Sequence, residues 1–205
     1  MKKLVLISLF ILSAIALYAE RHMVYVEDLW YLIDTENQIA IIMKEPENVV
    51  VTQDEGSGRK LIIPDTIHCS EFFEDEEADF VVVGIGESAF RDNTKLEKIV
   101  LPPHLLFIDN SAFLNCTKLK SITLPDGLIE IGYVAFAGCS SLQTITIPAT
   151  VNSISDYAFA NCKKLRKVEF LNSMGARAHK ETWFTGTKAS VGFILAPGES
   201  IENVY

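Results

Sequence analysis

The chain has 205 residues, enough for one sizeable domain or two small ones. Hydrophobic residues make up 49% of it, a share that can build a core and argues against intrinsic disorder. The formal net charge of -9 disfavours nucleic acid and anionic membrane surfaces as partners, because an acidic surface repels both.

Residues 1–19 have the pattern of a signal peptide. Two lysines precede an apolar run over residues 4–17, which is too short to span a bilayer comfortably and is followed by small residues typical of a cleavage site. We therefore expect an exported protein, located in the periplasm, at the cell surface or outside the cell. The alternative is an N-terminal helix that is not cleaved. No later run suggests a transmembrane segment in the mature chain.

Residues 20–57 predict an N-terminal cap built on a β-hairpin. Apolar and aromatic residues at 30–34 and 38–43 flank a polar stretch at 35–37, as in two strands joined by a turn. The open end of a repeat array exposes core, so an atypical segment is needed to cover it.

Residues 58–171 repeat with a period of 23 residues, and this period decides the fold class. One such unit cannot bury its apolar face alone, so successive units must stack on one another. The recurring residues include Ala89-Phe90, Ala112-Phe113, Ala135-Phe136 and Ala158-Phe159, then Leu96, Leu119, Leu142 and Leu165, and finally Cys116, Cys139 and Cys162.

Each unit predicts one short strand and one helical turn. In residues 119–124 the apolar Ile122 and Leu124 alternate with polar residues, and Pro125 ends the strand because it cannot donate to a ladder. Residues 131–139 then bring a second apolar set at helix-like spacing. We predict an α/β repeat solenoid: an arc with a parallel sheet of short strands on one face, short helical turns on the other, and β-rich caps at both ends.

This pattern resembles the BspA-like leucine-rich repeat, whose unit is close to L-x-x-I-x-L-P…I-G-x-x-A-F-x-x-C. Residues 131–148, IGYVAFAGCSSLQTITIP, match it almost throughout. The chain departs from it at Asn93, which stands in place of Cys, and at Asp109 and Ser155, which stand in place of Gly. The resemblance implies a leucine-rich-repeat arc with structural cysteines, and surface adhesion to host proteins or to other cells.

The first repeat unit carries an acidic insert at residues 66–80. Such a charge run is typical of a solvated loop, and here it would be either decoration or a binding element for a basic partner. A calcium site is the alternative, although the spacing of an EF-hand loop is absent. The insert has six acids in nine positions: Glu71, Glu74, Asp75, Glu76, Glu77 and Asp79.

Two features imitate cofactor or metal sites. The stretch from Gly84 to Ala89 fits G-x-G-x-x-A after a strand, but the same slot recurs in later units and Pro102-Pro103 interrupts any crossover helix. The cysteines lack C-x-x-C or histidine-paired spacing, so we expect neither metal nor cofactor. Buried free thiols are the preferred interpretation of the cysteine column, and disulfides between adjacent units remain the alternative.

Residues 172–205 predict a C-terminal cap, with a last strand at 191–195. The sequence contains no nucleophile motif, so we expect no enzyme. We expect a non-catalytic module that binds a host or envelope protein; a glycan-binding module using Tyr133 and Tyr157, or a purely structural envelope component, are the alternatives. The candidate binding residues are the outward strand positions Lys98, Val100, Ser121, Thr123, Thr144, Thr146, Lys167 and Glu169.

Overall fold

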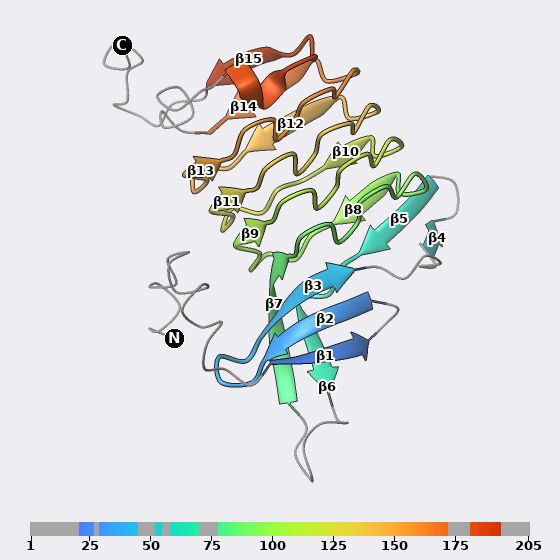
Figure 1. Ribbon diagram of the computed structural model, residues 1–205, viewed down its shortest axis with the longest axis vertical. Coiled ribbons are helices and arrows are strands. Elements are labelled where there is room, and N and C mark those ends of the chain that lie inside the picture. The colour runs from blue at the N-terminus through green and yellow to red at the C-terminus, as the bar shows by residue number, and fades with distance from the viewer. Residues whose placement is uncertain are drawn as a thin grey trace.

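A computed structural model describes residues 21–26, 29–44, 52–54, 58–69, 78–171 and 181–193. Figure 1 shows a small N-terminal sheet, above which the chain winds into a stack of similar coils. The expected signal peptide and five of the six acids in the insert lie outside the described residues.

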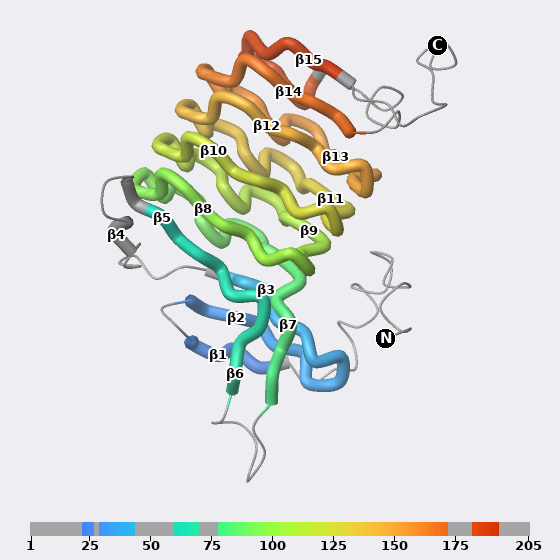
Figure 2. Tube along the Cα trace, turned by 180° about the vertical axis from the view of Figure 1, so that it is seen from behind, coloured from blue at the N-terminus to red at the C-terminus, as the bar shows by residue number. Residues whose placement is uncertain are grey.

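The N-terminal segment forms an antiparallel sheet of β1 (Arg21–Val26), β2 (Leu29–Asp34) and β3 (Ile39–Lys44), which confirms the predicted hairpin. On one side of this sheet Tyr31, Ile33 and Ile42 are fully buried. Strand β3 then pairs in parallel with β7 (Ala78–Ile85), the first strand of the coil stack on that side. The sheet of this segment is therefore continuous with the sheet of the repeats (Figure 2).

Each coil contributes short parallel strands to two ladders, as the 23-residue period requires. In the first ladder Lys98 pairs with Ser121 and Thr144 with Lys167, so equivalent residues lie side by side. The second ladder pairs Phe107 with Glu130 and Glu130 with Ser153. The strands of the first ladder fall into two sheets. One holds β5 (Gly58–Ile62), β8 (Lys98–Val100) and β10 (Ser121–Ile122), with β4 (Thr52–Asp54) antiparallel to β5, and the other holds β12 (Thr144–Ile147), β14 (Lys167–Phe170) and β15 (Ser190–Phe193). The second ladder holds β9 (Phe107–Ile108), β11 (Glu130–Ile131) and β13 (Ser153–Ile154).

The helical turns predicted opposite the strands do not form, and these segments are non-helical turns. An α-helix needs N–H groups that donate four residues back along the chain. Here the N–H groups of Ser88, Phe90 and Asp92 donate to carbonyl oxygens of the next coil at 2.8 to 3.0 Å. The intervening N–H groups of Ala89 and Arg91 close tight turns within their own coil. The only helix in the described residues is the 3-10 helix η2 (Glu181–Phe184).

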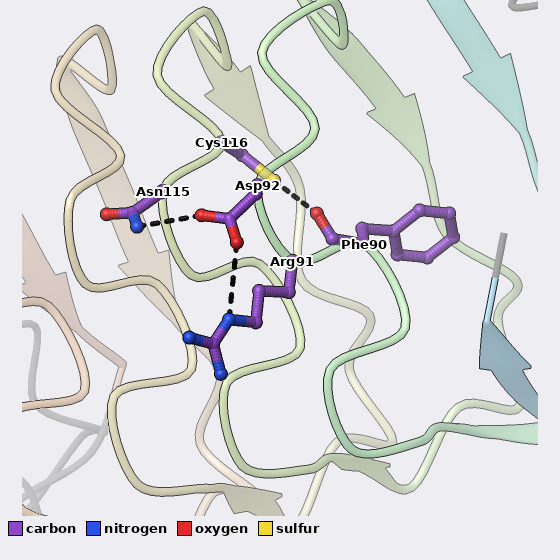
Figure 3. A network of polar contacts seen from close by, with 5 residues as sticks. All are labelled: Phe90, Arg91, Asp92, Asn115 and Cys116. Carbon is purple, nitrogen blue, oxygen red and sulfur yellow. Dashed lines mark hydrogen bonds and ion pairs between the residues drawn. The ribbon is translucent and has the colours of Figure 1, made fainter. Parts of the chain in front are cut away.

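This turn path requires left-handed backbone at two positions in each coil. Asp92 and Asn115 occupy one of them, with φ of 61° and 60°, and short polar side chains tolerate that region better than most. Asn115 Nδ2 also donates to Asp92 Oδ1 at 2.9 Å, which ties adjacent coils together (Figure 3). Val134 occupies the other position with φ of 48°, an uncommon conformation for a β-branched residue.

The core of the stack is a continuous column of phenylalanine rings, one from each Ala-Phe pair of the repeat. Phe90, Phe113, Phe136 and Phe159 stack nearly parallel, with neighbouring ring centroids 5.1 to 5.3 Å apart. The column extends beyond these pairs to Phe184 of η2, whose ring lies 5.4 Å from that of Phe159. Stacked aromatic pairs contribute about 0.5–1.5 kcal/mol beyond their area burial.

The cysteine column is buried and unpaired by disulfides, which confirms the preferred interpretation. Each Sγ donates to the carbonyl oxygen of a phenylalanine one coil earlier; Cys116 donates to Phe90 at 3.1 Å (Figure 3). The adjoining Cys116 thiol, together with burial, raises the pKa of Cys139 well above its ordinary value. Burial also raises the pKa of Cys162 to about 12.

We expect these thiols to be free and unreactive in the folded protein. The thiolate is the reactive species, and the raised pKa of Cys139 and of Cys162 removes it at pH 8, while burial shields the Cys116 thiol from a reagent. Titration with a thiol reagent at pH 8 should therefore be very slow before denaturation. Unreduced protein in denaturant should release all four thiols at once, the three of the column and that of Cys69, which is also buried and free. Fewer than four under denaturing conditions would show that disulfides hold the coils.

Candidate functional site

The candidate binding residues lie together on the outer face of the first ladder, which we call the strand face. Because side chains alternate along a strand, Ile99, Ile122, Ile145 and Val168 point into the core, and the candidate residues on either side of them point outward. Seven of the eight are exposed, and Glu169 is half-buried. Within this face Lys167 Nζ lies 2.7 Å from Glu169 Oε1, and such exposed ion pairs contribute little to stability.

An exposed apolar pair lies at the N-terminal end of the strand face. Ile62 of β5 is 56% exposed and pairs in register with Val100 of β8, which is 38% exposed. Ile62 was not among the predicted site residues, although the signal was present. It follows the inward-facing Leu61 in the strand before Pro64, so alternation turns it outward.

The acidic insert is framed by two strands. Strand β6 (Thr66–Cys69) pairs antiparallel with β7, and Ile67 and Phe80 on these strands are buried. Asp79, the only acid of the insert within the described residues, is exposed, and its Oδ1 lies 2.9 Å from His68 Nδ1. The apolar ends therefore anchor the insert in the sheet.

An exposed tyrosine pair lies on the turn side of the stack. Tyr133 and Tyr157 are 49% and 38% exposed, and their rings meet edge to face with centroids 6.1 Å apart. The two rings come from adjacent coils. They form a small aromatic surface away from the strand face.

A carboxylate pair lies on the second ladder. Glu130 of β11 has a buried Oε2 that accepts no hydrogen bond from any described residue. Burial, and after it the nearby Asp109 carboxylate, raise the pKa of Glu130 above its ordinary value. Both effects disfavour the charged form.

Neutralising Glu130 should stabilise the fold at neutral pH. Because the folded pKa exceeds the unfolded one, the wild type loses stability as pH rises from about 4.3 through the folded pKa. Glu130→Gln removes this loss. Chemical denaturation at pH 7 should show a more stable variant, and the difference should shrink toward zero below about pH 4. A variant that is less stable at pH 7, or whose difference is constant with pH, would contradict the assignment.

The G-x-G stretch is a packing feature. A Cβ on Gly84 would lie 2.1 Å from the Phe107 ring, and one on Gly86 would lie 2.6 Å from the Ile42 carbonyl oxygen. The Gly86 N–H donates to that same oxygen at 2.6 Å, so it is not available to a phosphate. These glycines fit β7 between β3 and β9.

The described residues contain no group of three or more histidine, cysteine or acidic side chains placed to hold a metal ion. Within the same residues no helix is long and apolar enough to cross a membrane. The strand face carries hydroxyl, lysine and short apolar groups and the Glu169 carboxylate.

Comparison with known proteins identifies the repeat. A family model described as BspA type leucine rich repeat region matches residues 83–193 in six copies. A leucine-rich repeat protein from Bacteroides capillosus is 26% identical with a TM-score of 0.59, and the match covers 72% of this chain and 97% of that protein's chain. A leucine rich cell surface protein from Faecalibacterium prausnitzii is 21% identical with a TM-score of 0.54, covering 85% of this chain and 51% of its own. The pneumococcal vaccine antigen PcpA is 18% identical with a TM-score of 0.55, covering 85% and 48%. A search of curated proteins finds no significant match.

Proposed function

The chain belongs to the BspA-type leucine-rich-repeat family, and from this membership we propose that it is a non-catalytic protein-binding module that works outside the cytoplasm. Leucine-rich repeats commonly serve as protein-interaction modules. We further propose that the coils follow an arc, so that the strand face presents an extended surface.

The strand face is the observation that carries this proposal. Its exposed positions run across successive coils, so a partner can contact many of them at once. Protein interfaces combine an apolar centre with a polar rim. The exposed Ile62–Val100 pair supplies apolar contact area at one end of the face, and the polar positions of β10, β12 and β14 continue the surface from there.

Location outside the cytoplasm rests on the sequence of residues 1–19, which has the basic start, apolar run and cleavage sites of an exported chain. Surface adhesion, or contact with an envelope protein, follows from that location and from the family. The acidic insert is a second candidate contact for a basic partner, since its strands β6 and β7 anchor it in the sheet.

A glycan-binding module is the second candidate, and the Tyr133–Tyr157 pair favours it. Exposed aromatic rings supply flat apolar surface on which a sugar ring can pack, and each tyrosine hydroxyl can hydrogen-bond. This pair lies on the turn side, so the two candidate functions use different surfaces and can be separated by mutation.

Site-specific photo-crosslinking tests the protein-binding proposal. A crosslinking residue at Thr146 lies on the strand face, and one at Asn152 lies at an exposed position just before β13 of the second ladder. Incubation of both proteins with extracellular and envelope fractions should give a discrete product from position 146 and none from 152. A glycan array run with wild type and Tyr133→Ala tests the alternative. Equal crosslinked products from both positions would argue against protein binding at the strand face. If Tyr133→Ala also lost a glycan signal that the wild type gives, glycan binding would be the better account.

A further inference from the structure

The charges of this acidic protein are strongly segregated. In each coil a turn follows the cysteine position and leads into the next strand of the first ladder; these turns occupy residues 93–98, 116–121, 139–144, 162–167 and 187–190. They hold nine of the 18 basic residues and one of the 27 acids, so they carry +8 while the rest of the chain carries -17. We call this edge of the stack, at the right of Figure 1, the basic edge.

Backbone hydrogen bonds align the turns of the basic edge in one row, in which the turn at 139–144 carries no basic residue. Lys120 N donates to Glu97 O at 3.0 Å, and Arg166 N donates to Gln143 O at 2.9 Å, so equivalent residues of successive coils lie side by side. Adjacent coils in such a ladder are about 4.8 Å apart. The nine basic side chains are all exposed: Lys95, Lys98, Lys118, Lys120, Lys163, Lys164, Arg166, Lys167 and Lys188.

Little of this charge is neutralised by the described residues. Glu97 pairs with Lys120 and Glu169 pairs with Lys167, and these are the two acidic contacts found for the nine side chains within the described residues. The field of the edge therefore remains positive although the whole molecule is negative. Such a row attracts anions from solution and concentrates them along the stack.

The chemistry of the edge indicates what kind of anion it fits. None of the large exposed hydrophobic residues lies in these turns, so the edge offers no anchor for a protein hot spot. It also has no aromatic ring on which a nucleic acid base could stack. Exposed lysines and small hydroxyl residues suit a ligand that is itself polar and charged at regular intervals.

We propose that the basic edge binds an anionic polysaccharide, sulfated or carboxylated, which lies along the stack across several coils. The polysaccharide contacts the lysines of the turns at 93–98 and 116–121 and of those at 162–167 and 187–190, and it crosses the uncharged turn at 139–144 between them. Its binding is driven mainly by the release of counterions. The site is distinct from the strand face proposed to bind protein, although Lys98 and Lys167 border both.

The test compares two variants with the same change in net charge. Lys163→Gln/Lys164→Gln removes two charges from the edge, and neither side chain makes a hydrogen bond or an ion pair with a described residue that would be lost. Arg91→Gln/Asn152→Asp also lowers the charge by two, at exposed positions off the edge. Binding of heparin and of polygalacturonate to the mature chain is measured between 0.05 and 0.3 M salt, with poly-L-glutamate and single-stranded DNA as comparators.

At least one polysaccharide should bind the wild type and the control alike. The lysine variant should bind about tenfold more weakly at low salt, and the slope of log affinity against log salt should fall by about 1.4 to 1.8. An equal loss in the control, tighter binding of poly-L-glutamate or DNA, or no polysaccharide binding at 0.05 M salt would overturn the proposal. None of these outcomes affects crosslinking from Thr146, so the two proposals fail separately.

Discussion

Replacing Phe136 by alanine should lower the free energy of unfolding by about 3–5 kcal/mol, the usual cost of removing a buried phenylalanine. Phe136 is fully buried and lies between two rings, with centroids 5.1 Å from Phe113 and 5.3 Å from Phe159. Its loss opens a cavity in the middle of the column and removes both stacking contacts. Neither neighbouring coil can move in to fill the space, because backbone hydrogen bonds fix the distance between coils.

Urea denaturation of the wild type and Phe136→Ala measures this difference. Tyr133→Ala is the matched control: it removes an aromatic ring of the same coil that is 49% exposed, and it should cost within about 1 kcal/mol. If Phe136→Ala cost no more than the tyrosine variant, the phenylalanine column would not be the core of the stack.

Replacing Trp183 by alanine should cost about 3–5 kcal/mol, concentrated at one end of the molecule. Trp183 is buried in η2, and its ring lies 6.2 Å from Phe170. Its carbonyl oxygen accepts from Phe159 N at 2.9 Å, so the residue holds the last coil to its neighbour. Since each coil contacts only those beside it, loss of the last one need not unfold the rest.

Amide hydrogen exchange distinguishes local from global loss. In Trp183→Ala three amides should lose protection from exchange. Those of Phe159 and Asn161 donate to carbonyl oxygens of the last coil, and that of Ser190 belongs to the last coil and donates to its neighbour. The amides of Phe113 and Phe136 should keep theirs. Uniform loss along the chain would mean that the stack unfolds as one unit and that the nearest-neighbour description is wrong.

The period of the sequence was enough to predict how the coils pair. A repeat of 23 residues without slippage places Ile122 beside Ile99 and Phe136 beside Phe113, as the structure shows. The inward and outward faces of the strands followed from alternation, which is why the candidate residues from Lys98 to Lys167 lie on one face.

The turn segments could not be predicted in the same way. The apolar spacing of Ile131, Ala135 and Phe136 suits a helical turn as well as it suits the observed path. What decides between them is the next coil, whose carbonyl oxygens accept from alternate N–H groups and so remove the donors of a helix. That contact is tertiary and leaves no local signal. The same contact between coils accounts for the left-handed backbone of Val134, because a β-branched residue by itself disfavours that conformation.

Two further features of the molecule are missed when the sequence is read only at the fixed 23-residue spacing and only by its net charge. Trp183-Phe184 follows Ala158-Phe159 by 25 residues instead of 23, so a search at fixed spacing misses it as the end of the column. A net charge of -9 likewise conceals the basic edge, although summing charge over equivalent turns reveals it from the sequence alone. Exposure of all nine side chains required the structure.

The most direct measurement of the proposed function is the affinity of the crosslinked partner for a strand-face variant. Thr123→Glu/Thr146→Glu places two charges beside each other on exposed positions of adjacent coils, where the side chains bear on no core residue. If the strand face binds protein, calorimetric titration should show at least a hundredfold weaker binding, because charges forced into an interface are left unpaired. Asn152→Asp should bind as the wild type does. Unchanged affinity in the strand-face variant, with an unchanged melting temperature, would mean that the partner binds elsewhere on the molecule.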